Sequence, residues 1–133
     1  MPELPEVEVV KQSLQKCILN KRFLKIIVKN KKLRFHVPQN LSARLSNLKI
    51  LNTNRISKYV VIEFEGGFFL IIHLGMSGTL HLLKSKNQNS NTNLSFYHSK
   101  NLPKKHNHIF FYLKDFTIIF NDPRRFGFVK LIK

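Results

Sequence analysis

The chain has 133 residues with a formal net charge of +16, and 43% of its residues are hydrophobic. These values fit one domain over residues 1–133 and exclude wholesale disorder, because enough apolar surface is present to offset the entropy of ordering the chain. The single cysteine, Cys17, excludes an internal disulfide and a cysteine-based zinc site, and no apolar stretch approaches the roughly 20 residues of a membrane span. We therefore expect a soluble, intracellular, monomeric protein with no membrane partner.

The first predicted element is a helix that ends near Asn20. Apolar residues recur at helical spacing, at Val7, Val10, Leu14, Cys17 and Ile18. Pro2 and Pro5 fit only at or before the first turn, where a proline removes no helical hydrogen bond. Glu6 and Glu8 near this start complement the positive end of the helix dipole.

The rest of the chain is predicted to be mainly β. The β-rich segments cover residues 23–29, 33–37, 48–54, 59–65, 68–74, 79–83, 109–114, 117–120 and 126–132, with a helical turn within 41–47. Gly66-Gly67 predicts a hairpin turn, and residues 84–105, rich in Asn, Ser and Lys, predict a surface loop. The expected fold is an antiparallel β-sandwich of about eight strands with an N-terminal helix and flanking helical cover.

The basic residues are unevenly distributed. Residues 9–62 contain 13 Lys or Arg and no acid, and residues 66–114 contain six more and no acid. Such a chain repels itself unless a polyanion neutralises it, and nucleic acid is the most common one, since each phosphate contact also releases counterions. The alternatives are a merely solvated basic face, produced by the codon bias of an AT-rich genome, and an anionic membrane surface. The second is disfavoured because no basic amphipathic helix is evident.

The chain begins Met-Pro-Glu-Leu-Pro-Glu. Removal of the initiator Met would leave Pro2 with a free secondary amine, and α-amino groups have a pKa of roughly 7.7–8.0, so part of it would be unprotonated at neutral pH. Such an amine attacks aldehyde-like carbons and forms a cationic iminium that promotes elimination at the next carbon, while Glu3 beside it can transfer protons. The alternative is that Pro2 and Pro5 only begin the helix.

Two glycine-containing loops carry candidate DNA wedges. In residues 73–78, His-Leu-Gly-Met-Ser-Gly, Met76 is either an exposed wedge that fills the gap left by an extruded base or ordinary core filling. In residues 122–127, Asp-Pro-Arg-Arg-Phe-Gly, Phe126 can enter a base step while one guanidinium bonds an orphaned base and the other holds a phosphate. The alternative for this segment is a turn whose Asp accepts bonds from backbone donors.

Lys58 and a histidine pair complete the candidates. Lys58, which precedes a predicted strand, is an ordinary surface lysine unless the fold brings it beside Pro2, where it could bind phosphate or help protonate a base. His106 and His108 lie two residues apart at a strand start, a spacing that suggests a metal. Because the carboxylate and Cys partners of a metal are missing nearby, phosphate contact or strand-edge polarity is favoured.

Taken together, these segments resemble the N-terminal domain of the bacterial formamidopyrimidine-DNA glycosylase family, over nearly the whole chain. The matching blocks are the Met-Pro-Glu-Leu-Pro-Glu-Val-Glu start, Ser-Lys-Tyr before a strand, His-Leu-Gly-Met-Ser-Gly and Asn-Asp-Pro-Arg-Arg-Phe-Gly. The related endonuclease VIII family also begins Met-Pro-Glu but usually has Gly at the fourth position, so Leu4 favours the formamidopyrimidine branch.

The resemblance implies roles for individual residues. Pro2 would attack C1′ of the damaged nucleotide and form a Schiff base, Glu3 would donate and accept protons, Glu6 would support the site, and Lys58 would contact the lesion or its phosphate. An intercalating set would fill the vacated space and probe the opposite cytosine: Met76, Arg124 and Phe126. Phosphate and other DNA contacts would come from Arg125, His73 and one of His106 and His108.

The implied function is the catalytic domain of a bifunctional glycosylase and abasic-site lyase that removes oxidised purines from double-stranded DNA by β,δ-elimination. It would act in the bacterial cytoplasm at the nucleoid, or in an organelle with an AT-rich genome. Family members are about twice this length, and their second half, with a helix–two-turn–helix unit and a four-Cys zinc finger, is expected to be absent here, so this chain itself would need no cofactor. The alternatives are a DNA-binding module without turnover, an N-terminal-proline tautomerase, which leaves the charge and both loops unexplained, and a ribosomal protein, which leaves the Pro2-Glu3 start unexplained.

Overall fold

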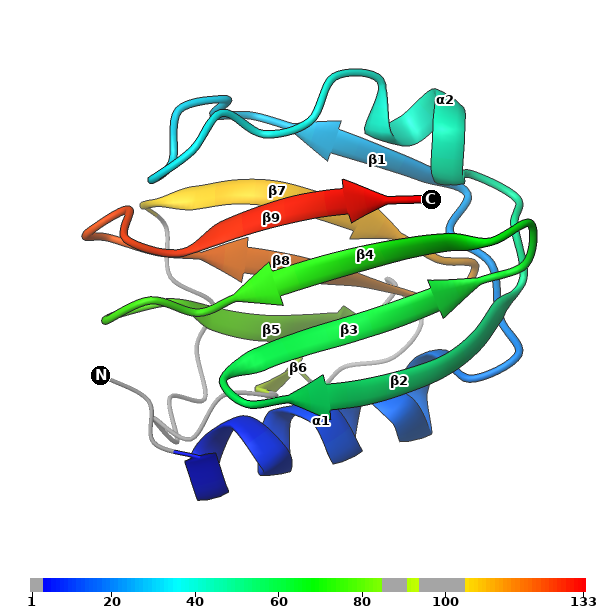
Figure 1. Cartoon of the computed structure of the whole chain (residues 1–133), viewed down its shortest axis with the longest axis horizontal. Coiled ribbons are helices and arrows are strands. Elements are labelled where there is room, and N and C mark those ends of the chain that lie inside the picture. Colours follow the sequence, from blue (N-terminus) through cyan, green and yellow to red (C-terminus); the bar gives the residue numbers. More distant parts are fainter. Residues whose placement is uncertain (1–3, 85–90, 94–104) are drawn as a thin grey trace.

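The computed structural model describes residues 4–84, 91–93 and 105–133. This part of the chain forms a two-layer antiparallel β-sandwich with helices along its sides (Figure 1). In chain order the elements are α1 (Leu4–Ile18), β1 (Lys25–Val28), α2 (Leu41–Leu45), β2 (Ile50–Ile56), β3 (Tyr59–Phe64), β4 (Phe68–His73), β5 (Thr79–Lys84), β6 (Asn91–Asn93), β7 (Asn107–Tyr112), β8 (Phe116–Asn121) and β9 (Phe128–Ile132). One sheet has the order β1-β7-β8-β5-β6 and the other β2-β3-β4-β9. The predicted fold class is confirmed.

Helix α1 runs along one open side of the sandwich, next to β2, while α2 and β1 lie on the opposite side (Figure 1). Its buried residues lie three or four positions apart and form one apolar stripe: Val7, Val10, Leu14 and Ile18. Asn20 adopts a left-handed backbone with φ 64°, which Asn tolerates and which ends the helix as predicted. No helix within the described ranges is long and apolar enough to cross a membrane.

The core lies between the two sheets, and Phe23 joins them. Its ring centroid lies 5.9 Å from that of Phe64 on β3 and 5.2 Å from that of Phe111 on β7, so one side chain contacts both layers. All three rings are almost fully buried. At the far end of the β3–β4 hairpin, Gly66 and Gly67 have φ of 84° and 82°, a left-handed conformation that glycine adopts without strain, as the predicted turn requires.

Two predicted segments differ from the structure. Residues 33–37 are not a strand of either sheet: the Asn30 side chain accepts a hydrogen bond from the Lys32 amide at 3.0 Å and turns the chain, leaving one isolated bridge between Lys32 and His36. Residues 91–93, predicted as part of a surface loop, form β6 beside β5, so the described chain has nine strands rather than about eight. The remainder of that predicted loop, from residue 85 to 104, lies outside the described residues.

Replacing Phe23 with Ala should destabilise the fold by about 3–5 kcal/mol, because it removes the ring that both sheets pack against and leaves a cavity. Thermal and urea unfolding of the variant would measure this loss. Phe126→Ala is the matched control: its ring is 44% exposed, so the same truncation should change the free energy of unfolding by less than about 1 kcal/mol. Equal losses in the two variants would contradict this description of the core.

Candidate functional site

Three connections between strands emerge at one end of the sandwich. In the four-stranded sheet, Tyr59 pairs with His73 and His73 with Phe128, so the β2–β3 turn, the β4–β5 loop and the start of β9 adjoin. In the five-stranded sheet, Asn121 pairs with both Thr79 and Asn107, which brings the β8–β9 loop to the same end. Figure 1 shows these connections on its left-hand side, where the first turn of α1 also lies. The fold therefore gathers segments that are far apart in sequence.

A buried carboxylate, that of Asp122, joins the β4–β5 and β8–β9 loops. Its Oδ1 accepts a hydrogen bond from the Ser77 hydroxyl at 2.6 Å, and its Oδ2 accepts one from the Gly127 amide at 2.7 Å. The Ser77 oxygen in turn accepts a bond from the Arg124 amide at 3.0 Å. Asp122 has no exposed surface, and a buried carboxylate is tolerated because its oxygens are bonded in this way.

Glycines allow the two loops to touch backbone to backbone. A Cβ at Gly75 would overlap the backbone of Phe126 and Gly127, and a Cβ at Gly127 would lie 2.7 Å from the carbonyl oxygen of His73. The tips carry Met76, 39% exposed, and Phe126, 44% exposed. The exposure of Met76 argues against the alternative in which it fills the core, and the loops present two apolar side chains to solvent from adjoining segments.

Arginines surround the exposed Phe126. The Arg124 guanidinium lies 5.6 Å from the centre of the Phe126 ring, within range of a cation–π interaction. Arg125 is exposed and has φ 59°, a conformation that a non-glycine residue holds only where its surroundings enforce it. The β8–β9 loop thus combines one flat apolar side chain with two exposed cations.

His73 sits in an aromatic cluster and is held as the neutral tautomer. Its Nδ1 accepts a hydrogen bond from the Gly75 amide at 3.0 Å, which leaves the proton on Nε2. Its ring stacks on Phe128 with centroids 5.0 Å apart and meets the edge of Tyr59 at 5.1 Å. Partial burial lowers the pKa of His73, and the nearby cations Arg34 and Lys58 lower it further.

The start of α1 is tied to the turn that carries Lys58. Glu8 Oε1 accepts a bond from Arg55 Nε at 2.7 Å, and the same guanidinium donates to the Ser57 carbonyl at 3.0 Å. Arg55 and then Lys11 lower the pKa of Glu8 to about 2. Pro2 and Glu3, predicted to carry the chemistry, lie outside the described residues. The helix that follows them is fixed next to the β2–β3 turn, and Glu6 lies partly buried in its first turn.

One of His106 and His108 was predicted to contact phosphate, and the two side chains differ in exposure. His108 is 2% exposed, and its Nε2 is hydrogen-bonded at 2.7 Å to the Asp122 carbonyl oxygen, so it supports the loop junction from inside. His106 is exposed, and its carbonyl accepts the Asp122 amide at 3.0 Å. Within residues 4–84, 91–93 and 105–133, no three His, Cys, Asp or Glu side chains gather where they could hold a metal.

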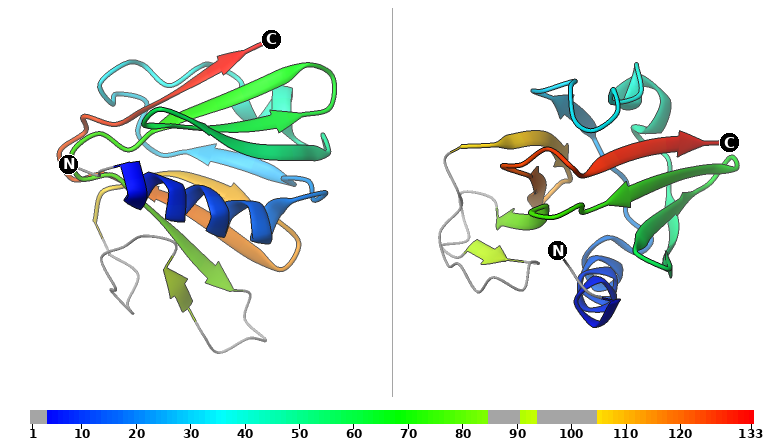
Figure 2. Two further views of the ribbon diagram at one scale, coloured as in Figure 1. Left: turned by 60° about the horizontal axis from the view of Figure 1, so that its bottom comes forward. Right: turned by 60° about the vertical axis from the view of Figure 1, so that its left-hand side comes forward.

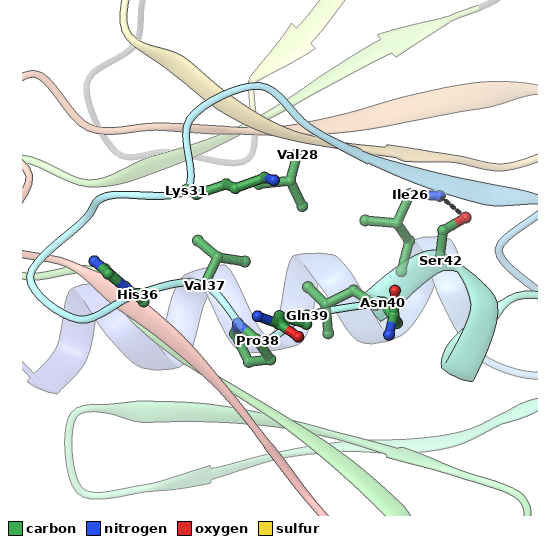
Figure 3. A pocket seen from close by; sticks show the side chains of 10 residues that line it. Ile26, Val28, Lys31, His36, Val37, Pro38, Gln39, Asn40 and Ser42 are labelled. Atoms are coloured by element: carbon green, nitrogen blue, oxygen red, sulfur yellow. Dashed lines mark hydrogen bonds between the residues drawn. The ribbon is translucent and has the colours of Figure 1, made fainter.

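A pocket of about 400 Å³ lies away from these residues (Figure 3). It is bounded by β1, by the start of α2 and by the segment between them, and Ser42 at one side bonds the Ile26 amide at 3.0 Å. Lys31 and His36 line it, whereas none of the predicted site residues does. This pocket is therefore separate from the candidate site.

Sequence reasoning missed three features of this site. It assigned no role to Ser77, to the Glu8–Arg55 pair, or to the segment around Arg34 whose charge reaches His73. The Asp-Pro turn did signal an Asp that accepts backbone bonds, and the Gly127 bond is of that kind. The other partners are 45 and 47 residues apart, a separation over which no local pattern operates.

Asp122→Asn should destabilise the protein by about 1–3 kcal/mol, because an amide N–H₂ group would replace one oxygen that now accepts a bond from a buried donor. Hydrogen exchange of the Gly127 amide should accelerate in the same variant. Asp115→Asn, an exposed change at the β7–β8 turn, should leave both measurements unaltered. Unchanged exchange at Gly127 would show that the carboxylate does not hold the loops.

The pKa of His73, measured by NMR titration, should lie below the ordinary value for histidine. Arg34→Gln should raise it, because the guanidinium disfavours the charged imidazolium. Arg44→Gln, which removes an exposed arginine of α2 that lies against Phe68, is the control and should not shift it. An Arg34 variant with an unshifted His73 would place that cation out of electrostatic range.

Comparison with known proteins agrees with this arrangement. The formamidopyrimidine-DNA glycosylase of Sinorhizobium fredii is 37% identical over 137 residues, and that of Agrobacterium fabrum is 34% identical over 137 residues; each match covers 100% of this chain and 46% of the relative. The chain thus spans about half the length of these relatives. It also resembles a solved complex of the Lactococcus lactis Fpg with DNA containing an abasic site, at a TM-score of 0.80 and 28% identity, over 98% of this chain and 43% of that one.

A second solved structure, of wild-type Lactococcus lactis Fpg (MutM) with DNA containing N7-benzyl-Fapy-dG, matches with a TM-score of 0.80 and 29% identity over 98% of this chain and 44% of that one. The family model described as the formamidopyrimidine-DNA glycosylase N-terminal domain matches residues 1–129. The chain therefore belongs to the formamidopyrimidine-DNA glycosylase N-terminal domain family.

Proposed function

We propose that this chain is the catalytic part of a DNA glycosylase and abasic-site lyase that removes oxidised purines from double-stranded DNA. The observation that carries the proposal is the joint exposure of Met76 and Phe126 on two loops held together by Asp122. The relatives are bacterial proteins named as formamidopyrimidine-DNA glycosylases, and the solved complexes contain abasic or Fapy-dG DNA. We place its action on DNA in the bacterial cytoplasm.

The two loops are suited to hold a duplex open. A base that leaves the stack costs a few kcal/mol, least when it is damaged, and an apolar side chain that occupies the gap offsets part of that cost. Met76 and Phe126 would fill the gap, and Arg124, now over the Phe126 ring, would bond the base left without its partner. Their exposure in the free protein means that no core residue has to move out first.

Phosphates would be bound beside the wedge. In the neutral His73, Nδ1 accepts the Gly75 amide and Nε2 carries the proton, so Nε2 can donate to a phosphate without a positive charge on the ring. Lys58 at the β2–β3 turn and Arg125 on the β8–β9 loop supply cations. Of the histidine pair, His106 is the better candidate because His108 is buried and bonded to the Asp122 carbonyl.

The chemistry would begin at Pro2 once the initiator Met is removed. The Pro2 nitrogen would attack C1′, and the C1′–base bond would break with its electron pair leaving on the base. The C1′–O4′ bond of the sugar ring would then break as Glu3 protonates O4′, and the nitrogen lone pair would form the C1′ iminium. The resulting iminium would acidify C2′, so that loss of a C2′ proton expels the 3′ phosphate and a second elimination expels the 5′ phosphate. The link from Glu8 to Arg55 and Ser57 supports this assignment, because it holds the start of α1 beside the turn of Lys58.

Borohydride trapping tests the proposal. The chain, with Met1 removed as verified by intact mass, should form a covalent adduct with an abasic duplex and with an 8-oxoguanine:cytosine duplex, and Pro2→Gly should form much less, because a primary amine gives an iminium that can lose its N–H proton. Asp115→Asn is the control and should trap normally. Binding to both duplexes without any adduct would identify a binding module that lacks turnover, and no binding at all would refute both functions.

A further inference from the structure

The segment 29–37 carries cations that the proposed site does not use. It forms a short basic hairpin, in which the Val37 amide bonds the Lys31 carbonyl at 2.9 Å and a bridge joins Lys32 to His36. Leu33 points inward with 9% exposure. The exposed basic side chains of this hairpin are Lys29, Lys31, Lys32, Arg34 and His36.

The basic hairpin is attached directly to the wedge region. The Arg34 amide donates to the Gly127 carbonyl at 3.3 Å, at the end of the β8–β9 loop. Phe35, 45% exposed, meets the Phe128 ring edge-on at 5.1 Å, and the Lys130 ammonium lies 4.8 Å from the Phe35 ring and 5.4 Å from the Phe128 ring. Both Figure 1 and Figure 2 show the hairpin close to this loop.

These cations are not neutralised within the described part of the chain. None of the five basic side chains forms an ion pair with a described carboxylate; Arg34 and Lys29 instead lie over the rings of Phe35 and Phe110. Arg34 is close enough to His73 to lower the pKa of that imidazole. Exposed like charges on one short segment repel one another, and a polyanion that contacts them relieves this repulsion.

We infer that the basic hairpin is a second phosphate-binding surface, which contacts the DNA backbone beyond the nucleotide that the wedge displaces. The inference rests on the proposed function for the identity of the polyanion as duplex DNA. Phosphate contacts of this kind position a protein on the duplex without reading its sequence, so the hairpin sets affinity and orientation and not lesion choice. Because the Arg34 amide is bonded to the Gly127 carbonyl, the phosphate-binding hairpin is held at a fixed position relative to Phe126.

The pocket beneath the hairpin offers a competing use for two of these residues. Lys31 and His36 line it (Figure 3), so either could bind a small anion there. Lys32 and Arg34 are not among the lining residues, so a small anion in the pocket does not account for them, whereas a polyanion bound outside the pocket would. The test therefore uses Lys32 and Arg34.

The experiment measures how duplex affinity depends on salt. A double variant, Lys32→Gln with Arg34→Gln, should reduce the magnitude of the slope of log K against log salt by about 1.8, because each lost phosphate contact removes roughly 0.9. The anchor to Gly127 uses the Arg34 backbone, which glutamine retains. Measurements at pH 8 keep His73 neutral in both proteins, and an abasic-analogue duplex avoids turnover.

The matched control removes one lysine and one arginine elsewhere, by Lys16→Gln on α1 with Arg44→Gln on α2, and should leave the slope unchanged. Equal slopes for the Lys32 and Arg34 variant and the wild-type protein, or an equal reduction in the control, would overturn the inference and leave the proposed function standing. A wild-type chain without salt-dependent duplex binding would overturn the proposed function itself. Thermal unfolding confirms that both double variants are folded.

Discussion

The buried carboxylate of Asp122 is the interaction on which the functional end of the molecule depends. The carboxylate accepts hydrogen bonds from Ser77 on the β4–β5 loop and from Gly127 on the β8–β9 loop. The backbone of Asp122 is also bonded: its carbonyl oxygen to the His108 ring and its amide to the His106 carbonyl. Desolvating a carboxylate is costly, and that cost is offset only while the donors stay in place. If either loop moved away, the buried carboxylate would lose a hydrogen-bond donor, so this interaction favours a single relative position of the two loops.

Electrostatics divides the basic residues into two groups. Arg55 and Lys11 are bonded to Glu8, an acid near the chain start, and this cluster fixes the helix against the β2–β3 turn. The cations of the basic hairpin and of the β8–β9 loop form no ion pair with an acid of the described residues, although the buried Asp122 is close in sequence to Arg124 and Arg125. The Asp122 carboxylate accepts its hydrogen bonds from Ser77 and Gly127, so the exposed guanidinium groups of Arg124 and Arg125 are not paired with it.

The sequence predicted correctly those elements that are determined by residues close together in the chain. The apolar stripe of α1, its end at Asn20 and the turn at Gly66-Gly67 each follow from spacing or backbone preference within a few residues. It was wrong at 33–37 because β-propensity there is outweighed by the turn at Asn30. The position of His108 inside the molecule was not predictable, because strand pairing decides which face of β7 is covered.

The exposed tips connect stability to function. Burial of apolar surface stabilises a fold by roughly 25 cal/mol per square ångström, and the exposed Met76 and Phe126 do not contribute this stabilisation. Without restraint, the loops would be expected to turn these side chains inward. The Asp122 junction and the close approach of Gly75 to Gly127 prevent that collapse. Under the proposed function, the ligand covers these apolar side chains and neutralises the cations beside them at the same time. Stacked bases on a phosphate backbone offer both properties in one ligand, whereas a membrane surface or an acidic peptide lacks the stack into which Phe126 can insert.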